Sequence, residues 1–205
     1  MHIEFLIEDR STEETLCYLL PKILGESITF ETHFFQGKED LFSQLPGGLK
    51  GYKKWIPDDW RIIILVDRDN EDCKKLKLKL EKIARDAGFV TRSKSKNNYQ
   101  LINRIMIEEL EAWFFGDISA LIKAYPKVSK NLSQNAKYRD PDDIKGGTWE
   151  ALEKALKDAG YHQGRLEKMR AARDIAPHMK PAKNISNSFQ VFYDCLLEIM
   201  ESENN

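Results

Sequence analysis

The chain lacks three features that would each have narrowed its function. Its cysteines, Cys17, Cys73 and Cys195, are few, odd in number and scattered, which argues against a disulfide framework or a cysteine-bound metal. No apolar run approaches the length of a membrane span. The N-terminal residues form a strand-like pattern that contains acids and does not resemble a signal peptide. We therefore expect a cytoplasmic protein with no membrane contact.

A basic excess is missing as well. The 32 Lys and Arg residues almost balance the 33 Asp and Glu residues, which leaves a formal charge of −1 at pH 7. A protein that binds nucleic acid on its own is expected to be basic over at least one domain. If nucleic acid is the substrate, its affinity must come from local patches, a metal ion or a partner protein.

The apolar content of 41% in 205 residues is enough for one α/β domain with a helical extension. Strand-like and helical patterns alternate in the first half of the chain, and the second half is helical throughout. This order predicts an α/β fold with a mostly parallel, four-stranded sheet flanked by helices. We expect an α/β domain over residues 1–116 and a helical extension over residues 117–205.

The element boundaries follow from hydrophobic periodicity. Strands are predicted at Ile3–Ile7, Ile28–Phe35, 62–66 and Phe89–Thr91. Helices are predicted at Thr12–Leu24, Glu39–Leu45, Glu71–Ala87, Ile107–Phe115, Ile118–Tyr125, Thr148–Ala159, Arg165–Ala176 and Ser188–Met200. A turn is predicted at 46–48, Gly88 is predicted to end the third helix, and 126–147 is predicted to form a surface loop.

The most informative stretch is the buried strand at residues 62–66 and the acids that follow it. This strand is continuously apolar and leads into Asp67-Arg68-Asp69. In open α/β sheets, ligands bind beyond the carboxyl ends of the strands. Two carboxylates at that position suit Mg²⁺ or Mn²⁺. The alternative is that Asp69 forms a turn and caps the next helix, although capping does not require Asp67.

A second acid, Glu8, follows the first predicted strand. Ser11 and Glu14 have the spacing of a capping box, so the helix start needs no functional explanation. Glu8 is left unexplained by that motif. Acids at two strand ends therefore predict a shared site.

A third candidate acid lies in the helix predicted at Ile107–Phe115. On a helical wheel, Glu111 falls inside the apolar arc, whereas Glu109 lies nearer a polar edge. A buried carboxylate is costly unless it is paired, protonated or bound to metal. We expect Glu111, with Glu109 as second choice, to contribute to the metal site. The alternatives are a buried ion pair with Arg10 or Arg104 and a half-exposed position.

With these residues in place, the chain resembles the TOPRIM fold shared by topoisomerases, primases and OLD-type nucleases. Members of that family carry a Glu after the first strand and an Asp-x-Asp after a later one, matched here by Glu8, Asp67 and Asp69. A closer resemblance is to a bacterial TOPRIM-like family marked by Glu-Leu-Glu-Ala-Trp, here 109–113, and by a late Asn/Ser-rich element, here 184–189. One departure is Asp9, because many TOPRIM proteins have Gly at that position.

The resemblance implies a metal-dependent nuclease in which Glu8, Asp67 and Asp69 are catalytic. Relatives are often encoded beside an AAA- or ABC-type ATPase in phage defence, which implies such a partner. We expect Arg10, Lys94 and Lys96 to contact phosphates, although each of them also fits a solvated surface charge. The expected substrate is nucleic acid, DNA or RNA, and a homodimer is left open.

Two other functions compete with the nuclease. A nucleotidyl or glycosyl transferase also uses an Asp-x-Asp to hold Mn²⁺, but it gives no reason for Glu8 or Glu111. A regulatory or toxin-like subunit would carry a vestigial site or act only within an ATPase complex. An assay of metal-dependent nucleic-acid cleavage, run with and without the ATPase, distinguishes these hypotheses.

Overall fold

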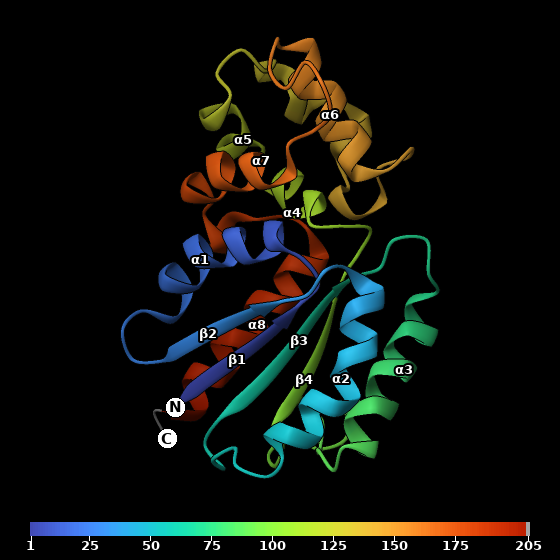
Figure 1. Cartoon of the computed structure of the whole chain (residues 1–205). Coiled ribbons are helices and arrows are strands. Elements are labelled where there is room, and N and C mark those ends of the chain that lie inside the picture. The colour runs from blue at the N-terminus through green and yellow to red at the C-terminus, as the bar shows by residue number, and fades with distance from the viewer. Residues whose placement is uncertain (204–205) are drawn as a thin grey trace. The chain divides into compact units, whose positions relative to one another are not determined.

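A computed structural model describes residues 1–203 and shows an α/β fold built on a four-stranded parallel sheet. The strands are β1 (His2–Ile7), β2 (Thr29–Phe34), β3 (Arg61–Asp67) and β4 (Leu101–Met106). Their order across the sheet is β2-β1-β3-β4, so β1 pairs in parallel with both β2 and β3 (Figure 1). The expected fold class, including the helical C-terminal half, is confirmed.

The residues group into two compact units. The first holds residues 1–13 and 26–105, and it contains the sheet together with helices α2 (Lys38–Tyr52) and α3 (Cys73–Asp86). The second holds residues 14–25 and those from 106 onward. Helix α1 (Arg10–Leu24) therefore begins in the first unit and continues in the second.

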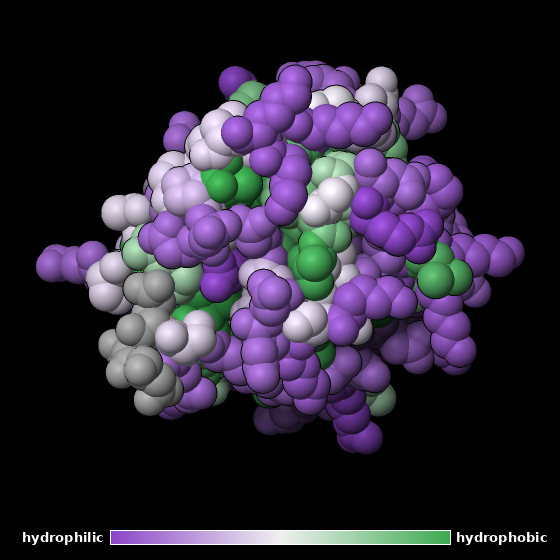
Figure 2. Space-filling view, turned by 90° about the horizontal axis from the view of Figure 1, so that it is seen from below, coloured by the Kyte–Doolittle hydropathy of each residue, from purple (hydrophilic) through white to green (hydrophobic). Residues whose placement is uncertain are grey.

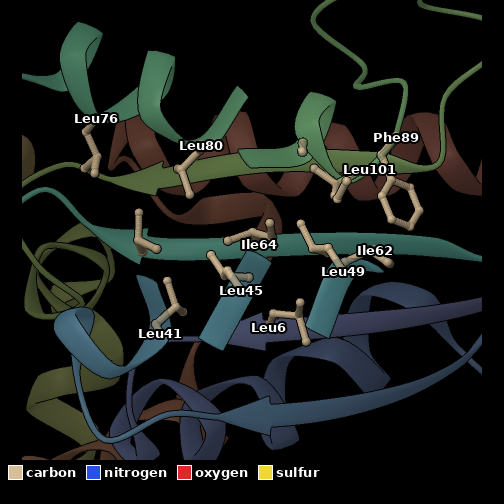
Figure 3. Packing of buried hydrophobic residues seen from close by; sticks show 13 residues of the cluster. Leu6, Leu41, Leu45, Leu49, Ile62, Ile64, Leu76, Leu80, Phe89 and Leu101 are labelled. Atoms are coloured by element: carbon tan, nitrogen blue, oxygen red, sulfur yellow. The ribbon is translucent and has the colours of Figure 1, made fainter. Parts of the chain in front are cut away.

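The core of the first unit lies between one face of the sheet and the helices α2 and α3. Alternate residues of a strand point to the same face, which places Ile62 and Ile64 beside each other on β3. They meet leucines of both helices in a single buried cluster, seen from close by in Figure 3. This packing fixes the ends of the strands and the starts of the helices that follow them.

Helix α2 is longer than its sequence pattern predicted. The turn expected at residues 46–48 is wrong, because α2 runs through Pro46 and three glycines to Tyr52. The reason is packing: Leu41, Leu45 and Leu49 recur at helical spacing and are all buried in the cluster. Their burial outweighs the unfavourable helix propensity of proline and glycine.

The fourth strand is also placed differently from the prediction. The expected strand at Phe89–Thr91 is reduced to a single bridge between Thr91 and Leu101, and the sheet strand is β4. One local signal around α3 behaves as expected, because Gly88 follows the C-cap residue Ala87 and has a positive φ of 86°. The start of the helix was not predicted: Asp72 caps it by accepting the Lys75 N–H.

The second unit contains α4 (Glu111–Gly116), α5 (Ile118–Ala124), α6 (Thr148–Asp158), α7 (Lys168–Ile175) and α8 (Asn187–Glu203). The helix predicted from Ile107 begins only at Glu111, because Glu108 has a positive φ of 62°. The stretch 126–147, predicted as a surface loop, instead includes short 3-10 helices and the buried residues Leu132, Tyr138 and Ile144.

The two motifs that carried the closer family resemblance contact each other in this unit. Trp113 is fully buried, and its Nε1 donates to the Ser188 hydroxyl at 3.1 Å. The Asn184 side-chain amide donates to the Trp113 carbonyl at 2.8 Å. Asp142 accepts the Ser188 N–H at 2.9 Å near the start of α8. These motifs therefore have a structural role in anchoring α8.

The surface is largely polar where Figure 2 shows it. The face seen from below is mostly hydrophilic, and its hydrophobic patches are small and separated from one another. Within residues 1–203, none of the helices combines the length and apolar character needed to cross a bilayer.

Candidate metal and phosphate site

Glu8 and Asp67 lie side by side at the carboxyl edge of the sheet. Glu8 directly follows β1, and Asp67 is the last residue of β3, which pairs with β1. The Glu8 Oε2 atom accepts a hydrogen bond from the backbone N–H of Asp67 at 3.2 Å. The Asp67 residue is only 5% exposed. The parallel register thus brings together two acids that are 59 residues apart in the chain.

Asp69 lies two residues beyond β3, where its backbone has a positive φ of 49°. Its carboxylate forms an ion pair with the Lys38 ammonium, which also lies 3.1 Å from a carboxylate oxygen of Glu71. The alternative that Asp69 caps the next helix is wrong, because Asp72 is the cap of α3. Asp69 therefore faces a cation at the same edge of the sheet.

Lys38 is the residue of this site that sequence reasoning missed. It is the first residue of α2, and the preceding Gly37 donates its N–H to the Glu8 carbonyl at 3.1 Å. Gly37 has a φ of 97°, a region that favours glycine. Burial alone would lower the pKa of Lys38, but hydrogen bonds to Asp69 and Glu71 raise it above its ordinary value. The signal in the sequence was a Gly-Lys pair shortly after β2.

The electrostatics of Glu8 are unusual for a carboxyl. Burial raises the pKa of Glu8 to about 7 from an ordinary value of 4.5, and the charges of Asp69 and Asp9 add to the rise. Lys38 and the backbone N–H of Asp67 oppose it by lowering the pKa. A carboxyl with a pKa near 7 can both accept and return a proton at neutral pH, which is what general acid–base catalysis requires.

Asp9, which stands where many TOPRIM proteins have glycine, has a local structural role. Its carboxylate accepts the Thr12 N–H at 2.8 Å and the Ser11 hydroxyl at 2.9 Å. Asp9 is therefore the cap of α1, and the expected capping box led by Ser11 is wrong. The cause is that α1 begins at Arg10, earlier than the pattern predicted.

The three residues predicted to contact phosphate, Arg10, Lys94 and Lys96, lie in two different parts of the first unit. Arg10 follows Glu8 closely, and its guanidinium lies over the Phe34 ring, 4.6 Å from the centroid. Lys94 and Lys96 are exposed in the connection that precedes β4. The end of that connection pairs with the start of β3, where Ile62 donates to the Gln100 carbonyl at 2.8 Å. The structure therefore brings Arg10, but not the two lysines, to the edge that holds Glu8.

Glu8 and Asp67 supply the hard oxygen ligands that Mg²⁺ or Mn²⁺ prefers, and Mg²⁺ needs only one or two carboxylates when phosphate and water complete its shell. Within residues 1–203, Glu8, Asp67 and Asp69 do not bring three ligand atoms within 4.8 Å of one another. The ion pair of Asp69 with Lys38 is a physical reason why the three carboxylates do not form one cluster. The donor set of Glu8 and Asp67 thus fits such an ion, whereas Asp69 is paired with Lys38.

Glu111, expected to be buried, is only 1% exposed in the second unit, so its predicted burial is confirmed. Its carboxylate lies 3.5 Å from the Lys168 ammonium. The expected rival partner was an arginine, Arg10 or Arg104, and the cation beside Glu111 in the second unit is Lys168. Participation of Glu111 in the metal site stays a prediction.

Glu109, the second choice, has a clear structural role in the same unit. Its Oε2 atom accepts the Thr148 hydroxyl at 3.2 Å and the Trp149 N–H at 3.3 Å. The residue before α6 is Gly147, which has no side chain to cap the helix. Glu109 therefore caps α6 from a distant position in the chain, which explains this acid without a metal ion.

Comparison with known proteins gives one match. The family whose model matches residues 7–197 is described as "Domain of unknown function (DUF4276)". No curated protein and no solved structure matches the chain. The match spans most of the chain and includes every acid of the candidate site.

Proposed function

This chain belongs to the DUF4276 family, and we propose that it is a divalent-metal-dependent nuclease with its site at Glu8, Asp67 and Asp69. One observation carries the proposal: the Glu8 carboxyl, whose pKa is raised to about 7, is bonded to the backbone of a buried aspartate at the carboxyl edge of the sheet. Perturbed acids in the ligand-binding crevice of an α/β sheet are candidates for catalysis.

The residues of this edge have complementary roles in hydrolysis. Glu8, Asp67 and Asp69 would hold Mg²⁺ or Mn²⁺, which supplies charge neutralisation at the phosphate when bound. Glu8 takes a proton from the attacking water as the new P–O bond forms. It then returns the proton to the oxygen released when the ester P–O bond breaks. Lys38 leaves Asp69 and binds a non-bridging phosphate oxygen, which offsets the developing negative charge.

The test is cleavage of labelled single- and double-stranded DNA and RNA by the purified chain. We expect cleavage with Mg²⁺ or Mn²⁺, none with a chelator, and a loss of at least about 100-fold in Asp67→Asn, because the ion loses a ligand. Asp58→Asn is the matched control, since Asp58 is an exposed acid just before β3, at its opposite end. Equal cleavage by the wild type and Asp67→Asn would contradict the assignment.

We propose that the nuclease acts in the cytoplasm with an AAA- or ABC-type ATPase in anti-phage defence. The formal charge of −1 supports dependence on a partner, because the chain has little overall attraction for nucleic acid. The cleavage assay is therefore run with and without the ATPase. The reaction products also distinguish a nuclease from the transferase alternative, because a transferase joins the cleaved group to an acceptor other than water.

A regulatory subunit is the second candidate, and the ion pair between Lys38 and Asp69 favours it. A lysine that permanently neutralises a ligand would make the site vestigial. In that case Mn²⁺ would bind no more tightly to the wild type than to Asp67→Asn, and no cleavage would appear even with the ATPase. Calorimetric titration of both proteins with Mn²⁺ decides between the two functions.

A further inference from the structure

A second group of metal-type ligands lies at the start of β1. His2 and Glu4 are two residues apart, so they point to the same face of the sheet. Glu31 on β2 is the register partner of Glu4. Each of the three offers one ligand atom, and these atoms all lie within 4.8 Å of one another. Glu4 precedes Glu8 by four residues, about 13 Å along a strand, so one ion cannot be shared between the two sites.

Glu4 is held rigidly with one oxygen already satisfied. It is only 4% exposed although it carries a carboxylate. Its Oε2 atom contacts the His33 Nε2 at 2.6 Å and accepts the Tyr52 hydroxyl at 3.1 Å. Its Oε1 atom is turned toward His2. Such outer contacts on a carboxylate are typical of metal ligands, because they fix its orientation.

His2 points its Nε2 atom at that second oxygen. Its Nδ1 lies 2.7 Å from the Thr29 hydroxyl, and the ring lies 4.1 Å from the Trp60 ring, centroid to centroid. Its Nε2 is buried and has no hydrogen-bond partner among residues 1–203, yet it lies 3.3 Å from Glu4 Oε1. At this distance an unprotonated Nε2 and a carboxylate oxygen repel each other unless a positive charge, carried by a proton or a metal ion, lies between them.

The separation of the two atoms matches a shared ion. For bonds of about 2.0–2.1 Å, two ligands of a tetrahedral Zn²⁺ site lie about 3.3 Å apart. An imidazole with carboxylates is a donor set that suits zinc, and a site with three protein ligands leaves a fourth position for water. Glu31 is exposed, which gives an ion a path from solvent.

We propose that His2 Nε2, Glu4 Oε1 and a Glu31 carboxylate oxygen bind a Zn²⁺-type transition-metal ion. Glu31 belongs to β2, which is an edge strand of the sheet, so the bound ion links β2 to β1. His33 and Tyr52 hold Glu4 in place, and Thr29 holds His2. This site is independent of the proposed nuclease centre in both position and ligand chemistry.

The test is calorimetric titration of the metal-stripped chain, without a histidine tag, with Zn²⁺. We expect one equivalent to bind the wild type and the double variant Asp67→Asn/Asp69→Asn with the same affinity. His2→Gln and Glu31→Gln should each weaken binding by at least about 10-fold. The fold should tolerate Glu31→Gln because Glu31 is exposed. His178→Gln is the matched histidine control.

Co²⁺ provides a readout of geometry. A tetrahedral site gives intense visible absorption bands with Co²⁺, and these should appear in the wild type and vanish in His2→Gln. Unchanged Zn²⁺ affinity in His2→Gln and Glu31→Gln would overturn the proposal and assign His2 and His33 as proton-bearing partners of Glu4. Loss of Zn²⁺ binding only in the aspartate double variant would also overturn it, because the ion would then occupy the other edge.

Discussion

Replacing Glu8 by Gln should stabilise the metal-free protein while it removes nuclease activity. The wild-type carboxyl is buried beside Asp69 and Asp9, and these surroundings raise its pKa to about 7. Ionised Glu8 is therefore unfavourable in the folded state. Gln keeps the shape of the side chain and can still accept the Asp67 N–H, but it carries no charge.

The magnitude follows from the pKa difference between the folded and unfolded states. Because the folded-state pKa is the higher one, the folded protein binds the proton more tightly between pH 4.5 and about 7. The stability contributed by this proton is fully present below pH 4.5 and is lost as the pH rises to about 7. At about 1.4 kcal/mol per pKa unit, the rise from 4.5 to about 7 corresponds to a loss of about 3.5 kcal/mol, and partial solvent exposure of Glu8 makes this an upper bound.

The assay is urea unfolding of the wild type and Glu8→Gln from pH 4 to 8 in the presence of a chelator. We expect similar free energies of unfolding at the acid end and a growing advantage for Glu8→Gln toward neutral pH. Glu26→Gln, in an exposed position after α1, controls for the loss of one negative charge. Saturating Mg²⁺ should then stabilise the wild type but not Glu8→Gln, because Gln is a poor ligand for that ion.

A constant difference between the two proteins at every pH would refute this reasoning. It would mean that Glu8 has the same proton affinity in the folded and unfolded states. A Glu8→Gln protein that is less stable than the wild type at pH 8 would refute it more strongly. In that case the ionised carboxylate would stabilise the fold, and its role would be structural.

Two further predictions concern the second unit. Gly116→Ala should lower the free energy of unfolding by about 1–3 kcal/mol, because the added Cβ would lie 1.9 Å from Asn184 Oδ1. Gly47→Ala is its control in urea unfolding, since a Cβ there meets no atom within 4 Å. Glu111→Gln should reduce nuclease activity far more than stability if Glu111 serves the metal site. Full activity with reduced thermal stability would instead make Glu111 a structural partner of Lys168.

Local patterns were sufficient to predict most of the elements. Apolar runs identified the strands β1 and β3, and the helix stop at Gly88 follows from the freedom of glycine at positive φ. Acids at the ends of parallel strands were expected to meet, because parallel strands share one carboxyl edge. This reasoning needed only sequence order and periodicity. It predicted that Glu8 and Asp67 are neighbours, and the Asp67 N–H donates a hydrogen bond to the Glu8 carboxylate.

Other features depended on contacts between distant residues. Helix α2 continues through Pro46 because its leucines pack on the sheet, a gain that local propensity does not include. Lys38 reaches Asp69 only because β2 lies beside β1, and Glu109 caps α6 across 39 residues of chain. Glu4 and Glu31 meet because the parallel register aligns them. Secondary structure follows largely from neighbours in sequence, whereas ion pairs, raised pKa values and ligand sets arise only when packing fixes which distant groups face each other.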